Sequence, residues 1–146
     1  MARVRVVELS AAGTHDLRRR VLRVGTVTTS VDFDGDESAV HLGVMIDSDV
    51  VAVSSWFDRR HPDRPGVVGR QLRAMAVEPS LTGTGLGSML LSAGLERMRS
   101  DGAGLVWARA RDTALDFYTL RGFEVFGEGY VDLSTGLPHH DVIRLI

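Results

Sequence analysis

The stretch Ala76–Glu96, AVEPSLTGTGLGSMLLSAGLE, decides the fold expected for this chain. An apolar, strand-like run reaches Pro79, and three glycines follow at alternate positions: Gly83, Gly85 and Gly87. A helical pattern begins directly after them. Amides at a helix N-terminus are unpaired and partly positive, and glycines without Cβ leave them open to a ligand. The stretch therefore predicts either a phosphate site or a turn that packs strand and helix closely.

Two other phosphate-binding motifs do not fit this turn. A Walker A loop needs a lysine, and all 17 basic residues of the chain are arginines. A dinucleotide-binding G-x-G-x-x-G turn needs a third glycine where Ser88 stands, and it follows the first strand rather than a strand past mid-chain.

Composition predicts one globular domain, residues 1–146, with 44% hydrophobic and 25% charged residues. No apolar run approaches the roughly 20 residues that span a bilayer, and no leader pattern is visible, so we expect a cytoplasmic protein without a membrane partner. A net charge of −2 without a basic stripe argues against nucleic acid, and Arg18–Arg20 is expected to be a solvated helix face. The chain has no cysteine, which excludes disulfides, zinc–thiolate sites and thiol nucleophiles.

The periodicity of apolar residues predicts a mixed sheet with helices on its faces, an α/β fold. The first helix carries Leu17 and is capped by Ser10 or Thr14. The central helix has an apolar stripe of Leu86, Met89, Leu90 and Ala93, and a capping box at Thr113–Asp116 opens the last helix. Strands are expected at 4–9, 38–46, 50–57, 71–77, 104–110, 123–131 and 139–146, with helices near 14–22, 86–101 and 114–121.

The segments LRAMAVEPSLTGTGLGSMLL (72–91) and FYTLRGF (117–123) closely resemble the GNAT N-acetyltransferase superfamily. Its signature is a strand, then [Q/R]-x-x-G-x-[G/A], then a helix, with an FY…GF segment some 30 residues later. The resemblance covers nearly the whole chain in element order, and GLPHHD (136–141) is similar to the Gly-x-Pro-His tail of small bacterial members. It implies a mostly antiparallel, splayed sheet flanked by helices, and transfer of an acetyl group from acetyl-CoA to a primary amine.

The resemblance also implies which residues bind acetyl-CoA, the expected co-substrate. The pantetheine arm would pair with the backbone of the fourth strand where the sheet splays, and the pyrophosphate would lie on the amides of the glycine turn. Family members usually carry Gln or Arg at the position of Thr82, and many carry Asn at that of Arg111. The resemblance therefore leaves open whether Thr82 and Arg111 contact the cofactor. The implied cofactor-binding residues are Met75, Ala76, Val77, Thr82, Gly83, Thr84, Gly85, Leu86, Gly87, Ser88, Arg111 and Phe117.

Two residues are candidates for proton transfer. Tyr118 matches the family tyrosine that protonates the leaving thiolate of CoA, a group with a pKa of about 8.5. Its alternative role is packing, since it shares a helical face with Phe117. His139 is a candidate general base, because no carboxylate occurs in the fourth or fifth strand, although a strand-terminal histidine can also be structural. His139 and His140 lack a third ligand nearby, so no metal is expected.

The acceptor is expected to be a small-molecule or peptide amine. Segment 23–37 is irregular, and Asp32, Asp34, Asp36 and Glu37 there would favour a cationic amine if they border the acceptor site. Trp56, Phe57, Asp58 and His61 either line that site or belong to the core.

Without a cysteine nucleophile, we expect direct transfer in a ternary complex, and a homodimer is a family-level expectation. The alternative function is a non-catalytic acyl-CoA-binding or regulatory module with the same fold.

Overall fold

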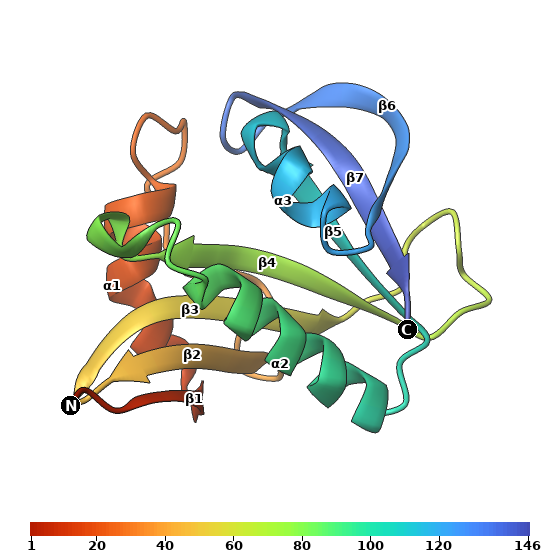
Figure 1. Cartoon of the computed structure of the whole chain (residues 1–146). Helices are drawn as coiled ribbons and strands as arrows, with labels where there is room; N and C mark the ends of the chain where they lie inside the picture. The colour runs from red at the N-terminus through yellow and green to blue at the C-terminus, as the bar shows by residue number, and fades with distance from the viewer.

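The computed structural model describes all residues, 1–146, and arranges them around one seven-stranded sheet (Figure 1). The strand order is β1-β2-β3-β4-β5-β7-β6, and only β4 and β5 are parallel neighbours. The expected mixed, mostly antiparallel sheet is thus confirmed. The strands are β1 (Val4–Leu9), β2 (Val40–Ile46), β3 (Asp49–Asp58), β4 (Gly69–Val77), β5 (Leu105–Arg111), β6 (Glu124–Asp132) and β7 (Leu137–Leu145).

Helices cover both faces of the sheet (Figure 1). The long helix α2 (Leu86–Ser100) packs on β2, β3 and β4, and the short helix α3 (Leu115–Thr119) packs on β6 and β7. The opposite face of β3 and β4 is covered by a continuous helical segment near the N-terminus. That segment consists of η1 (Ala11–Thr14), α1 (His15–Leu17) and the π-helical turn η2 (Arg18–Leu22). No helix of the chain combines the length and the apolar content needed to cross a bilayer.

The helix starts agree only partly with the sequence-based expectations. Ser10 caps η1, since its side chain accepts a hydrogen bond from the amide of Gly13 at 3.4 Å, whereas Thr14 caps nothing with its side chain. The expected capping box at Thr113 is wrong, because α3 is preceded by the 3₁₀ turn η4 (Asp112–Ala114) and has no side-chain cap.

The main hydrophobic core lies between α2 and the sheet. Leu86 and Leu90 of the expected stripe are buried, but Met89 is 42% exposed and Leu91 takes its place in the core. Further along α2, Gly94 faces Trp56, whose indole is 1% exposed. A Cβ on Gly94 would lie 1.9 Å from Cζ2 of Trp56, so only glycine lets α2 approach the sheet this closely.

The parallel pair β4–β5 opens along its length. Its ladder runs from the pair Gly69–Leu105 to the pair Leu72–Ala108 and ends there, while β5 continues to pair with β7 as far as Arg111. A β-bulge lies just beyond the end of this ladder, where Ala74 has a φ of +57°. A bulge bends its strand and redirects the following side chains. The expected splay of the sheet after the fourth strand is therefore confirmed.

Replacing Gly94 with alanine should destabilise the fold. The new methyl group would displace the rigid, buried indole of Trp56, and overpacking of this kind costs about 1–3 kcal/mol. Urea unfolding measures the change in the free energy of unfolding. The control is Gly66→Ala, whose Cβ would meet no atom within 4 Å and which should change stability by less than about 0.5 kcal/mol. A Gly94→Ala protein as stable as the unmodified chain would contradict the packing described here.

Candidate functional site

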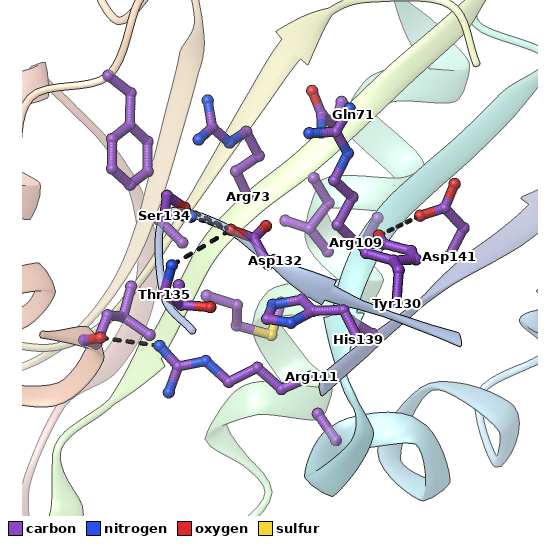
Figure 2. Close-up of a pocket in the computed structure, with 18 of the residues that line it drawn as sticks. Gln71, Arg73, Arg109, Arg111, Tyr130, Asp132, Ser134, Thr135, His139 and Asp141 are labelled. Carbon is purple, nitrogen blue, oxygen red and sulfur yellow. Dashed lines mark hydrogen bonds between the residues drawn. The ribbon is translucent and has the colours of Figure 1, made fainter. Parts of the chain in front are cut away.

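A cleft of about 750 Å³ occupies the opening between β4 and β5 (Figure 2). Its walls come from four parts of the chain: the two splayed strands, the first turn of α3, the β6–β7 hairpin and the N-terminal helical segment with the loop that follows it. The lining residues are Leu22, Arg23, Phe33, 71–75, 108–111, Ala114, Tyr118, 130–135, His139 and Asp141.

The glycine turn leaves a run of backbone amides without partners. No amide from Gly83 to Ser88 donates a hydrogen bond to an acceptor in the chain. Gly83 and Gly85 have φ values of +80° and +90°, and a Cβ on either would point into open space. The first turn of α2 also lacks an acidic side chain. The start of α2 is therefore a positively polarised surface that is open to an anion.

The third glycine of the turn, Gly87, has a different role. A Cβ there would lie 3.3 Å from Cε1 of Phe117, so this glycine lets α3 approach the start of α2. Phe117 in turn contacts the ring of Tyr118 edge to face, with centroids 5.3 Å apart. This chain of contacts places the free amides beside the residue that reaches the cleft from α3.

Tyr118 lies at the boundary between core and cleft. Its ring is 8% exposed and also contacts Phe123 at 5.2 Å, while the residue lines the cleft. The hydroxyl makes no hydrogen bond within the chain, and burial raises its pKa to about 12. The phenol is therefore protonated at neutral pH and free to donate its hydrogen. The packing role and the site role predicted from the sequence both fit its position.

His139 lies on the β7 wall of the cleft and is 4% exposed. Its Nδ1 lies 2.8 Å from the carbonyl oxygen of Leu137, which can only accept, so Nδ1 carries a hydrogen, and in the neutral ring Nε2 then has the lone pair. Nε2 has no partner in the chain. Its neighbour His140 instead contacts Oδ1 of Asp112 at 2.7 Å, as expected for successive strand residues on opposite faces. No three potential metal-binding side chains cluster anywhere in the chain.

Residues 15 to 123 match the sequence model of the acetyltransferase (GNAT) family. The chain belongs to the GNAT acetyltransferase family. The uncharacterized N-acetyltransferase YitI of Bacillus subtilis (strain 168) is 26% identical over 140 residues, which cover 94% of this chain and 93% of YitI.

Solved structures share the GNAT fold over nearly the whole chain. A Lactobacillus plantarum protein superimposes with a TM-score of 0.80 at 18% identity, covering 97% of both chains. The PaiA N-acetyltransferase from Thermoplasma acidophilum, solved in complex with coenzyme A, superimposes with a TM-score of 0.72 at 14% identity, covering 99% of both chains.

The structure adds a carboxylate that the sequence reasoning missed. Asp141 lines the cleft from β7 and accepts hydrogen bonds from Nε2 of His61 at 2.9 Å and from the hydroxyl of Tyr130 at 2.5 Å. Burial and the carboxylate of Asp141 together raise the pKa of Tyr130. The sequence signal was its spacing, because Asp141 lies two residues after His139 and so on the same face of a strand.

The acidic residues of segment 23–37 do not line the cleft, so the expectation that they would bias it toward a cationic amine is wrong. Only Arg23 and Phe33 of this segment reach it. Asp36 is instead bound by Arg18, with Nη1–Oδ2 and Nη2–Oδ1 distances of 2.8 and 3.0 Å. Arg18 is fully buried, whereas Arg19 and Arg20 are exposed, so the expected solvated face is wrong for Arg18 alone.

The Arg18–Asp36 pair anchors the irregular segment to the sheet. Arg18 also donates hydrogen bonds to the carbonyl of Val31 at 2.8 Å and to Oγ of Ser55 at 2.9 Å. Burial alone would raise the pKa of Asp36, but the hydrogen bonds from Arg18 and from the amide of Phe33 outweigh it and lower that pKa. This network holds the ring of Phe33 at the cleft wall, 4.1 Å from the guanidinium of Arg18.

The four residues before the fourth strand do not form the cleft either. Trp56 belongs to the core, and His61 is buried beneath Trp107 and Phe126. Phe57 and Asp58 line a smaller hollow of about 180 Å³, which adjoins the cleft at Gln71 and Arg73.

Asp36→Asn should lower the free energy of unfolding by about 3–5 kcal/mol, because it leaves the guanidinium of Arg18 buried without a counter-charge. Urea unfolding at pH 7 measures this loss. Since folding lowers the pKa of Asp36, its contribution is complete above the unfolded pKa of about 3.9 and disappears as the pH falls through the folded value.

The matched control is Asp34→Asn, since Asp34 is exposed and forms no ion pair. It should change stability by less than about 0.5 kcal/mol. Equal effects of the two substitutions would show that the Arg18–Asp36 pair does not anchor the segment.

Proposed function

We propose that this GNAT acetyltransferase transfers the acetyl group of acetyl-CoA directly to a primary amine while both substrates are bound. Family membership provides the reaction class and acetyl-CoA as the co-substrate. The observation that carries the proposal is the run of unpaired amides at the start of α2, beside the opening between β4 and β5.

The residues present fit coenzyme A. A pyrophosphate needs several hydrogen-bond donors and no nearby carboxylate, and Gly83–Ser88 and the first turn of α2 meet both conditions. We propose that these amides hold the pyrophosphate and that the backbone of Met75, Ala76 and Val77 holds the pantetheine arm, because β4 has lost its β5 partner there.

Thr82 and Arg111, the two residues that differ from the family pattern, already form hydrogen bonds within the chain. Oγ1 of Thr82 donates to the carbonyl of Pro79 at 3.1 Å, and Nη2 of Arg111 donates to that of Leu22 at 2.8 Å. Contacts of these two side chains with a CoA phosphate stay predictions. We assign the phosphate interaction to the backbone instead.

Acetyl-CoA supplies an activated acyl group whose leaving thiol has a pKa of about 8.5 in water. We propose that Tyr118 donates its free hydroxyl hydrogen to the leaving sulfur. With a pKa of about 12, the phenol of Tyr118 first donates a hydrogen bond to the sulfur and transfers its proton only as negative charge builds up there. The same burial raises the pKa of a thiol at that position, which brings the two groups closer to a match.

We propose that His139 accepts the proton of the attacking amine. Its hydrogen bond to Leu137 fixes the tautomer, so the unpartnered Nε2 is the basic atom. The chain has no cysteine, so direct attack on the thioester is favoured over a thioester intermediate on the protein.

Gly85→Ala should weaken the binding of coenzyme A at least about tenfold, which corresponds to about 1.4 kcal/mol. The new methyl group would enter the space above the free amides. Isothermal titration calorimetry with coenzyme A measures this change.

Gly102→Ala is the matched control, because Gly102 has a φ of +93°, faces open space and lies at the other end of α2. Both substitutions introduce the same left-handed strain of roughly 1–2 kcal/mol. If both weaken coenzyme A equally, the effect is one of stability and the assignment of the amides is wrong.

Tyr118→Phe should lower kcat by about 10²-fold or more, because the leaving sulfur loses its hydrogen-bond donor. The Kd for coenzyme A should stay within about twofold, since the ring and its packing are retained. A thiol-release assay across a panel of primary amines measures turnover. Binding of acetyl-CoA without turnover of any amine would instead indicate the non-catalytic module.

A further inference from the structure

Two arginines of the cleft, the half-buried Arg73 and the exposed Arg109, have no hydrogen-bond or ion-pair partner. Arg23 donates to the carbonyl of Ser30 at 2.6 Å, and Arg111 is bound to Leu22, but Arg73 and Arg109 donate no hydrogen bond and form no ion pair. Arg73 is half-buried, with its guanidinium 4.3 Å from the ring of Phe33. A half-buried cation without a counter-ion is unfavourable, so an anionic partner would be expected to bind there.

The carboxylates of the cleft do not fill this role. Oδ1 of Asp132 accepts hydrogen bonds from the amide and hydroxyl of Ser134, at 2.8 and 2.6 Å, and neither oxygen of Asp132 bonds to Arg73 or Arg109. Asp141 lies opposite Arg109 across the β5–β7 ladder, yet its oxygens accept from His61 and Tyr130 instead.

The splay places the two arginines on facing strands of the cleft. The last pair of the parallel ladder is Leu72–Ala108, and Arg73 and Arg109 are the next residue on each strand. In Figure 2 both side chains extend to the same side of the pocket, away from Arg111 and His139. In agreement with this geometry, burial and the nearby charges, Arg109 first among them, lower the pKa of Arg73.

We propose that Arg73 and Arg109 bind an anionic oxygen group of the acceptor, a carboxylate or a phosphate, so that the substrate class is an amine that also carries an anion. Planar guanidinium groups form paired hydrogen bonds with such oxygens. A purely cationic amine would meet four arginines here against two carboxylates that are already hydrogen-bonded. The inference rests on the proposed function and assigns the opposite end of the cleft, at His139, to the reacting amine.

The test is a thiol-release assay with acetyl-CoA and three groups of acceptors. The first group carries an anion (glycine, L-glutamate and O-phosphoethanolamine), the second is uncharged apart from its amine (ethanolamine), and the third is a diamine (putrescine). We expect the highest kcat/KM in the first group. Comparison of the carboxylates with phosphoethanolamine shows which anion is preferred.

Arg73→Gln and Arg109→Gln should each raise the KM for the anionic amine by about 10- to 100-fold, the factor for losing a hydrogen bond to a charged group. The KM for acetyl-CoA should be unchanged. Arg73→Lys and Arg109→Lys, which keep the charge, should recover part of the affinity. Arg99→Gln is the control, because Arg99 pairs with Glu96 on the surface of α2, and thermal unfolding of each variant verifies the fold.

Turnover confined to ethanolamine and putrescine would overturn this inference and leave the proposed function standing. A rise in the KM for acetyl-CoA rather than for the amine would also overturn it, since it would assign the arginines to the cofactor. No turnover with any amine would contradict the proposed function and the inference together.

Discussion

The separation of β4 from β5 beyond Leu72 and Ala108 is the constraint on which the rest of the structure depends. Backbone groups that leave a ladder need other partners, because unpaired buried polar groups are costly. On the β5 side, β7 continues to supply them as far as Arg111. On the β4 side, the bulge at Ala74 and the loss of the parallel neighbour leave an edge inside the molecule. An extended ligand that pairs with this edge would complete the sheet.

The splay also explains why the site draws on both faces of the sheet. The glycine turn and α3 belong to the α2 face, where Phe117 packs on Gly87 and Tyr118 is part of the main core. The arginines and His139 belong to the face covered by the N-terminal segment, which the Arg18–Asp36 pair holds in place. In the proposed reaction, this opening would let acetyl-CoA on one face meet the acceptor on the other.

Local patterns made much of this arrangement predictable. The alternate glycines after an apolar strand and the FY…GF segment indicated the family, and the order of strands and helices followed from periodicity. The errors concern residues whose role depends on tertiary partners. The sequence around Arg18 indicates a surface residue, because its partner Asp36 lies 18 residues later and approaches it only in the folded chain. Asp141 belongs to β7 rather than to β4 or β5, and only the antiparallel pairing of β7 with β5 brings this carboxylate to the cleft. Met89 is exposed and Leu91 is buried, the reverse of the expectation, because the buried face of α2 is centred on Gly94 and its contact with Trp56.

In the proposed function, backbone amides at the start of α2 bind the pyrophosphate of coenzyme A. Calorimetric titration of the unmodified protein with coenzyme A and with pantetheine, which lacks the adenosine and all three phosphates, including the pyrophosphate, tests this most directly. Coenzyme A should bind at least about 100-fold more tightly than pantetheine, as expected for two or more charge-assisted hydrogen bonds. Equal affinity for the two compounds, or no binding of coenzyme A, would contradict it.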